Sequence, residues 1–261
     1  MRIFHIAVAA AFACGLACGP ALSADICQKY GPQTPRDITN KNGTNPRVFP
    51  FAPAPSKMNL CNIHFHTNAE HKGPGFKVFA GSGEHGGYKC NGSDKLTKAE
   101  LKAPAHEGCH GVKPGDTIEV HWVYSSCDVK PGKGLGSCLS DQCANPSLRV
   151  ETQVFLVVNN NKARDFGKYV YGGHIVRGLY QPKALPTGTG KPVVFLGSTT
   201  GPQYTEAKCS PMQVTWSVRP VCAKIDIHSL DKWCESNVFK EDHAHGVRQL
   251  VTAPTLLSKI K

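Results

Sequence analysis

Short runs of hydrophobic and polar residues, of the length and pattern of β-strands, recur along most of the chain and are separated by clusters of Gly, Pro and Asn. The predicted strands span 60–66, 76–80, 117–124, 150–158, 168–171, 174–179, 192–196 and 212–219. Only two stretches could form helices, 96–101 and a segment near Ser229, whose side chain is suited to cap a helix N-terminus. The pattern predicts one mainly β domain, built around a central, largely antiparallel sheet with few short helices.

The N-terminal part of the chain departs from this pattern. Residues 1–24 have the features of an export signal, because Arg2 is followed by an apolar, Ala-rich stretch. Residues 25–58 are rich in proline and therefore cannot form a long helix or a central strand. We expect a signal peptide over 1–24, an extended arm over 25–58 and one globular domain over 59–261. No later stretch reaches the roughly 18 apolar residues that a membrane helix needs.

Cysteine usage supports export. Beyond the signal lie ten cysteines: 27, 61, 90, 109, 127, 138, 143, 209, 222 and 234. An even number in an exported chain predicts a disulfide framework, and the absence of any Cys-x-x-Cys pair argues against a cysteine zinc site. We expect a disulfide to close the Gly- and Lys-rich loop at 127–143, whereas the spacing leaves the other pairs open. The protein is expected to be secreted or periplasmic.

Net charge excludes one class of partner. The formal charge is +11, or +10 without Arg2. The basic residues are scattered, with no run of five and no interleaved aromatic residues, so nucleic-acid binding is not expected. A mildly basic surface can favour small anions, although it can equally be a soluble surface without a specific partner. The sequence leaves the oligomeric state open.

The first predicted strand carries a His-x-His pair. Because side chains alternate across a strand, His64 and His66 point to one side, and Cys61, Ile63 and Phe65 point to the other. Two imidazoles on one face, two residues apart, can reach one metal ion. Two histidines on a solvated strand face would show the same pattern, so the pair needs a third ligand.

A second predicted strand, 117–124, supplies that ligand. Glu119 and His121 lie on one face of this strand, and its other face is apolar. A metal-bound histidine usually donates its second ring N–H to a carboxylate or carbonyl, which Glu-x-His provides. Three neutral imidazoles, from His64, His66 and His121, would leave the fourth tetrahedral position of zinc for water, as in catalytic sites. Alternatively, His121 is an ordinary core histidine, and Glu119 pairs with a lysine. Cadmium and cobalt also accept three imidazoles.

The remaining histidines give weaker signals. Two acid–imidazole pairs lie in loops between the two strands, namely Glu70-His71 and Glu84-His85. His106 lies in a Gly- and Cys-rich loop. A second His-x-His, formed by His243 and His245, lies in a polar C-terminal stretch without strand alternation, and we interpret it as a solvated tail rather than as a metal site.

Residues 59–73, Asn-Leu-Cys-Asn-Ile-His-Phe-His-Thr-Asn-Ala-Glu-His-Lys-Gly, resemble the delta-class carbonic anhydrases. The resemblance extends to 81–90 and to the strand of His121, and it covers most of 59–235. It implies a zinc enzyme that catalyses the reversible hydration of CO2 to bicarbonate. It also implies that 59–261 is the catalytic domain.

Shorter motifs are similar to those of the alpha-class carbonic anhydrases. That class also has a Gly-Ser-Glu-His stretch between its two His-bearing strands, which is similar to 81–85, and a threonine loop, which is similar to 197–202. In the alpha class and in this chain, a cysteine and then Val-Thr-Trp come after the threonine loop; here they are Cys209 and residues 214–216. The gap from His66 to His121 is longer in this chain than the corresponding gap in the alpha class. The resemblance implies a disulfide from Cys209 to Cys27 or Cys61, since a similar link holds the threonine loop in exported alpha-class enzymes.

The resemblance also implies a mechanism. Zinc lowers the pKa of a bound water to about 7, and the resulting hydroxide attacks CO2. Thr199 would orient this hydroxide, with Glu84 or Glu70 behind it, and Glu119 would support a zinc ligand. Neutral CO2 needs an apolar pocket beside the metal, for which the candidates are Val123, Val157 and Trp216. A histidine would carry the released proton to solvent, and the candidates are His71, His85 and His106.

Two other functions fit an exported, disulfide-rich β protein with paired histidines. An oxidoreductase of the copper–zinc superoxide dismutase type would need a bridging histidine and a zinc-binding aspartate, for which the chain has no matching spacing. A non-enzymatic zinc- or sugar-binding protein would show no turnover. Copper content would favour the first alternative. Inhibitor binding at an open zinc position would argue against the second.

Overall fold

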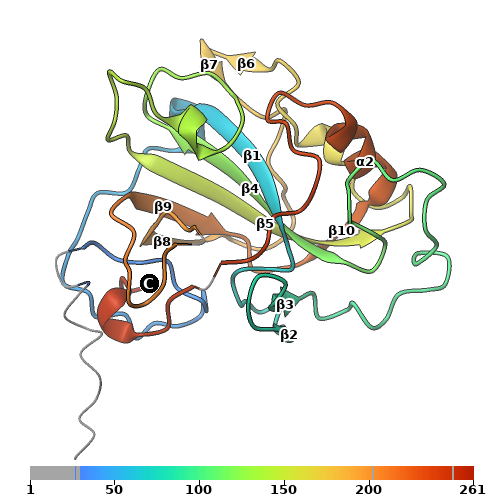
Figure 1. Cartoon of the computed structure of the whole chain (residues 1–261), viewed down its shortest axis with the longest axis horizontal. Helices are drawn as coiled ribbons and strands as arrows, with labels where there is room; N and C mark the ends of the chain where they lie inside the picture. The colour runs from blue at the N-terminus through green and yellow to red at the C-terminus, as the bar shows by residue number, and fades with distance from the viewer. Residues whose placement is uncertain (1–26, 28–29, 202, 249) are drawn as a thin grey trace, which may run out of the picture.

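The structure is a computed structural model that describes residue 27 and residues 30–201, 203–248 and 250–261 (Figure 1). The predicted export signal, 1–24, lies outside the described residues. Within the described part, no helix has both the length and the apolar character needed to cross a membrane.

A six-stranded sheet forms the centre of the protein, with strand order β1-β4-β5-β9-β8 and with β10 beside β5 (Figure 1). Its strands are β1 (Asn59–Thr67), β4 (Thr117–Ser125), β5 (Leu148–Val158), β8 (Val193–Ser198), β9 (Gln213–Val218) and β10 (Ala223–Asp226). The pairs β1–β4, β4–β5 and β8–β9 are antiparallel, whereas β9 and β10 both run parallel to β5. This arrangement confirms the predicted fold class.

The other elements are short. Two small hairpins are formed by β2 (Val78–Gly81) with β3 (Gly87–Lys89) and by β6 (Ile175–Val176) with β7 (Leu179–Tyr180). The only α-helix among the described residues is α2 (Ile227–Glu235), and the 3-10 turns are η1 (Pro55–Lys57), η2 (Leu135–Cys138), η3 (Phe166–Lys168) and η4 (Pro254–Leu256).

The two faces of the sheet bury different side chains. On one face, apolar residues of β1 and β4, such as Phe65 and Trp122, pack with Leu230 and Trp233 of α2 in one hydrophobic cluster. On the opposite face, apolar residues of β5, β8 and β9, such as Trp216, form a second cluster. Burial of a large apolar side chain stabilises the folded state by about 1.5–3 kcal/mol, so both clusters hold the sheet in place. The histidines of β1 and β4 lie on the second face.

Several sequence predictions of local structure were wrong. Residues 96–101 form turns rather than a helix, because a segment this short gains too few hydrogen bonds to offset nucleation. Residues 168–171 are not a strand: Lys168 ends η3, and residues 169–171 follow it without regular structure. The helix predicted near Ser229 begins earlier, at Ile227, and its cap residue is Asp226. Ser229 instead donates its hydroxyl hydrogen to the Asp226 carbonyl at 2.8 Å.

A β-bulge near the start of β1 changes one side-chain direction. The register shifts between Leu60 and Asn62, so Cys61 is an extra residue between the pairs Leu60–Tyr124 and Asn62–Val123. Simple alternation predicts Cys61 on the face of Ile63 and Phe65. The bulge places it in the opposite cluster.

Five disulfides join all ten described cysteines: Cys27–Cys209, Cys61–Cys138, Cys90–Cys222, Cys109–Cys234 and Cys127–Cys143. The predicted closure of the 127–143 loop is confirmed. Of the two partners expected for Cys209, the structure shows Cys27. Two of the bridges hold the 127–143 loop: Cys127–Cys143 closes its ends, and Cys61–Cys138 links it to β1.

The described part of the N-terminal arm is extended and lies beside the C-terminal segment. Isolated bridges join Gln33 to Leu257 and Pro35 to Val251. The Thr34 hydroxyl donates to the Ser198 carbonyl at the end of β8. The arm and the C-terminal segment therefore pack together beside the strand end that leads into the predicted threonine loop.

Candidate metal centre

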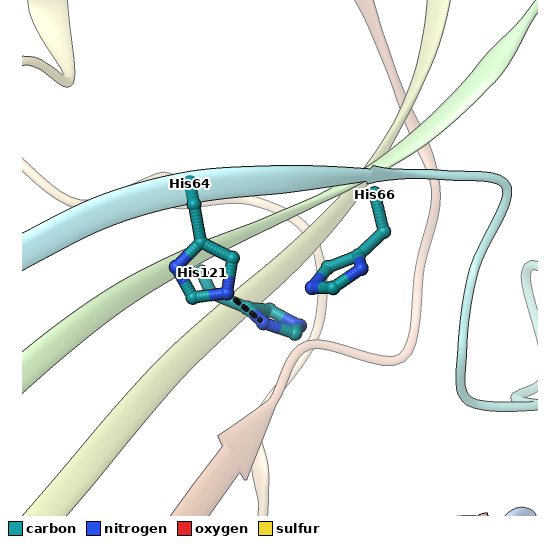
Figure 2. Close-up of side chains that lie close together, drawn as sticks. All are labelled: His64, His66 and His121. Atoms are coloured by element: carbon teal, nitrogen blue, oxygen red, sulfur yellow. Dashed lines mark hydrogen bonds between the residues drawn. The ribbon is translucent and has the colours of Figure 1, made fainter. Parts of the chain in front are cut away.

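The register of β1 against β4 brings three histidines together. His64 lies directly opposite His121, and His66 lies opposite Glu119. Directly opposed side chains in an antiparallel pair have Cβ atoms roughly 5 Å apart, so the His64 and His121 rings meet, and His66 reaches them diagonally. The three ring centroids are 4.9–5.1 Å apart. Figure 2 shows the rings converging on one side of the two strands.

Each ring has one nitrogen engaged by a different partner. His64 Nδ1 donates to Asn62 Oδ1 at 2.6 Å, since the amide nitrogen of Asn62 already donates to the Gly132 carbonyl. His66 Nδ1 donates to the Gly246 carbonyl at 3.0 Å. His121 Nε2 donates to Glu119 Oε1, also at 3.0 Å. These bonds fix the tautomer and orientation of all three rings.

The other nitrogens, Nε2 of His64 and His66 and Nδ1 of His121, converge and lie within 4.8 Å of one another. His121 Nδ1 is 3.2 Å from His64 Nε2, and His66 Nε2 is buried without a hydrogen-bond partner. In a tetrahedral zinc site with Zn–N bonds of 2.0–2.1 Å, nitrogens lie about 3.3 Å apart. The three histidines therefore fit a zinc ion, and the unpartnered nitrogen of His66 has no other evident function.

Burial favours the neutral form of two of these histidines. Desolvation, followed by the charges of His121 and His66, lowers the pKa of His64 well below 6.5. Desolvation also lowers the pKa of His66 to about 4, although the Glu70 carboxylate opposes this shift. Both imidazoles therefore have free lone pairs at neutral pH, which metal binding requires.

Glu119 joins His121 to a fourth histidine. Its Oε1 accepts from His71 Nδ1 at 2.6 Å, and its Oε2 accepts from the His71 backbone N–H at 3.2 Å. Burial alone would raise the pKa of Glu119. The His71 charge and the hydrogen bonds from His121 and His71 outweigh this effect, so the pKa of Glu119 lies well below its usual value of 4.5. His71, Glu119 and His121 could also hold a metal by distance alone. We interpret them as a hydrogen-bonded chain, because both rings donate to the carboxylate.

The two candidate carboxylates behind the threonine lie in different places. Glu70 is fully buried, its Oε1 accepts from the Arg248 backbone N–H at 2.7 Å, and its Oε2 has no partner. Glu84 lies in an exposed loop. The Thr199 hydroxyl is hydrogen-bonded to the Ser210 hydroxyl at 2.5 Å rather than to either carboxylate.

An apolar cavity of about 230 Å³ borders the histidines. Its lining includes His64, His121, Val123, Leu135, Leu139, Leu148, Val150, Thr199, Val214 and Trp216. The 127–143 loop, here called the roof loop, contributes Leu135 and Leu139 to it. The structure brings two of the predicted pocket residues, Val123 and Trp216, to this cavity. It places Val157 in the cluster on the other face, because β5 alternates and Val157 points toward α2.

A second, polar cavity of about 330 Å³ borders the histidines on another side. Its lining includes Asn62, His64, His66, Lys133, Leu135, Thr200, Lys240, Glu241, Asp242, His243, His245 and Arg248. The His245 ring lies 5.9 Å from that of His64 and 6.0 Å from that of His66, centroid to centroid. The C-terminal stretch interpreted from the sequence as a solvated tail is therefore part of the site. The His-x-His pattern was visible in the sequence, but nothing local indicated that it lies beside β1, because His245 is far from β1 in the chain.

The predicted proton carriers do not line either cavity. His71 is fully buried beneath Glu119. His85 and His106 lie in exposed loops, and His106 forms an ion pair with Glu235.

Comparison with known proteins identifies the family. The family model for delta carbonic anhydrase matches residues 55–229, which is more than half of the chain and includes His64, His66 and His121. No curated protein matches the chain. Among solved structures, the alpha-carbonic anhydrase from Thermovibrio ammonificans in complex with the inhibitor sulfanilamide is similar, with 17% identity over 88% of each chain, but the TM-score of 0.30 is too low to bear on fold or function. The family match confirms the resemblance found in the sequence, and the chain is an enzyme of the delta carbonic anhydrase family.

Proposed function

We propose that the protein binds one zinc ion through His64, His66 and His121 and catalyses the reversible hydration of CO2 to bicarbonate. The observation that carries the proposal is the convergence of three imidazole nitrogens at the edge of an apolar cavity. Bound there, zinc would lower the pKa of a water to about 7 and so supply hydroxide at neutral pH.

Thr199 and Glu70 are the residues we propose to orient the attacking oxygen. Thr199 lines the same cavity as His64 and His121, which supports this role. Glu70 supports the role of the buried carboxylate better than Glu84, because it lies 3.5 Å from the His66 ring and keeps one unpartnered oxygen. This arrangement needs Thr199 to exchange its hydrogen bond with Ser210 for a bond to the reacting oxygen.

The apolar cavity is the proposed site for CO2. Val123 and Trp216 lie on its wall beside His121, and Val150 and Val214 extend the same surface. An uncharged, weakly hydrated substrate loses little on entering such a cavity, and water there finds few hydrogen-bond partners. The geometry therefore favours CO2 near the reacting oxygen.

The proton released in each turnover needs a path to solvent, and we propose the polar cavity for it. His245 lies beside the triad and hydrogen-bonds to Glu241 at 2.8 Å. Its ring centroid is 5.1 Å from that of His243, which is exposed and paired with Asp242. These side chains, with water in the cavity, form a polar route outward.

We also propose that the protein is exported to the periplasm or the cell exterior. The five disulfides support this, because such bridges form and persist in oxidising compartments.

Metal analysis with two variants tests the proposal. The purified protein should contain about one zinc per chain, and His121→Ala should lose it in dilute chelator. Thr199→Val should retain zinc but turn over CO2 more slowly, since the hydroxyl orients the nucleophile and does not bind metal. Full zinc content in His121→Ala, or copper in place of zinc, would contradict the assignment.

A further inference from the structure

Three cations line the wall of the polar cavity. Among the described residues, the side chains of Lys133, Lys240 and Arg248 form no hydrogen bond or ion pair within the limits for such contacts, although all three line this cavity. The two carboxylates of the same wall are paired with histidines, Glu241 with His245 and Asp242 with His243. Three cations against two carboxylates leave the lining with a net positive charge.

Arg248 is the one of these three cations that borders both the histidines and the threonine loop. It lines the polar cavity together with His64 and His66, and it also lines a small adjoining cleft with Thr199 and Thr200.

The backbone of Arg248 is held from both sides. Its N–H donates to Glu70 Oε1 at 2.7 Å, and its carbonyl accepts from the Arg36 guanidinium at 3.4 Å. These contacts fix the point from which the side chain extends. An arginine fixed in this way presents a planar set of N–H donors that matches the two oxygens of a carboxylate or of bicarbonate.

We propose that Arg248, supported by Lys133 and Lys240, binds bicarbonate beside the histidine triad. The identity of the anion rests on the proposed function, whereas the anion site itself rests on the unpaired cations. The apolar and polar cavities share His64, Leu135 and Thr200 in their linings. Neutral CO2 therefore approaches the triad from the apolar side, and the anion leaves or enters on the cationic side.

Nuclear magnetic resonance of zinc-loaded, ¹⁵N-labelled protein tests binding directly. The arginine Nε–H signal that is missing from the Arg248→Gln spectrum is assigned to Arg248. This signal should move and saturate as bicarbonate is added up to tens of millimolar. It should still do so in Lys191→Gln, which removes a positive charge from an exposed loop position outside the cavity lining. A stationary Arg248 signal would overturn the proposal.

Dehydration kinetics give an independent measurement. Loss of a hydrogen bond to a charged group should raise the KM for bicarbonate about ten-fold or more in Arg248→Gln, at unchanged zinc content. Arg248→Lys keeps the charge but lacks the planar set of donors, so its KM for bicarbonate should lie between those of the wild type and Arg248→Gln. An equal KM in Arg248→Gln and Lys191→Gln would contradict the site.

The two experiments separate this proposal from the proposed function. Zinc-loaded protein that does not hydrate CO2, but whose Arg248 signal saturates with bicarbonate, would keep the anion site and remove the carbonic anhydrase reaction. Active protein with a stationary Arg248 signal would keep the reaction and remove the anion site.

Discussion

Each histidine of the triad is oriented by a different kind of acceptor: the Asn62 amide, the Gly246 carbonyl and the Glu119 carboxylate. All three acceptors belong to the protein itself, so these hydrogen bonds orient the rings. A pre-oriented ligand set loses little conformational freedom when an ion binds, which favours tight binding. Among the three, only Glu119 has a charge, and it should have the largest effect on ligand basicity.

Glu119→Gln should weaken zinc binding without unfolding the protein. The ionised carboxylate accepts from both His121 and His71, and the amide keeps one oxygen but loses the charge. Loss of such a partner typically costs 10–100-fold in metal affinity or activity. Competition with a chelator measures the affinity. The control is Glu84→Gln in the exposed loop, which should match the wild type, and an unchanged affinity in Glu119→Gln would refute the role of this carboxylate.

The buried histidines should make the metal-free protein sensitive to acid. The pKa of His66 is about 4 in the folded state and close to 6.5 when unfolded. The unfolded chain therefore binds more protons, and the contribution of His66 to stability is complete above pH 6.5 and is lost as the pH falls toward 4. The loss from His66 alone is roughly 3 kcal/mol in the free energy of unfolding.

Urea unfolding of the metal-free protein at pH 7 and pH 4.5 measures this effect. The wild type should lose stability between the two values, and His66→Gln should lose less. An equal loss of unfolding free energy between pH 7 and pH 4.5 in the two proteins would show that His66 is not buried in its neutral form.

At the scale of elements, the roof loop connects the disulfides to the metal site. Gly132 donates its N–H to the Cys61 carbonyl and accepts from the amide of Asn62, the residue that orients His64. Cys61–Cys138 fastens the same loop to β1, and this bond is possible because the bulge turns Cys61 to the histidine face. A loop distant in sequence from His64 thus controls the orientation of its ring.

Removal of the Cys61–Cys138 bridge by Cys61→Ser with Cys138→Ser should affect both stability and the site. The loss of a native disulfide typically costs about 2–5 kcal/mol. Zinc affinity and CO2 hydration should also fall, because the Gly132–Asn62 contact and the cavity wall at Leu135 loosen. The control is Cys90→Ser with Cys222→Ser, which breaks a bridge outside both cavity linings. Equal losses of zinc affinity in the two double variants would contradict a specific function of the roof.

The two strands that bear the three histidines, β1 and β4, could be predicted from the sequence. Alternation over β1 and β4 and the spacings His-x-His and Glu-x-His are local properties, so they predicted which histidines could meet without knowledge of the register. The bulge at Cys61 and the parallel strand β10 depend on pairing with distant segments. The same applies to Val157, whose direction follows from the register of β5 and not from its hydrophobicity.

At the scale of the whole molecule, the chain termini complete the site. The C-terminal segment pairs with β1 at His66 through His245 and then continues beside the N-terminal arm. It contributes His245 and Arg248 to the polar cavity, so the triad lies between an apolar and a charged environment. This division is a tertiary property, which explains why neither residue was assigned to the site from the sequence.

The most direct test of the account is stopped-flow CO2 hydration by protein with measured zinc content, across pH 6–9. The account predicts catalysis that increases with pH through a pKa near 7, inhibition by sulfonamides or small anions at the open zinc position, and loss of activity in the zinc-free His121→Ala variant. Fully zinc-loaded protein that hydrates CO2 no faster than buffer over this range would contradict it.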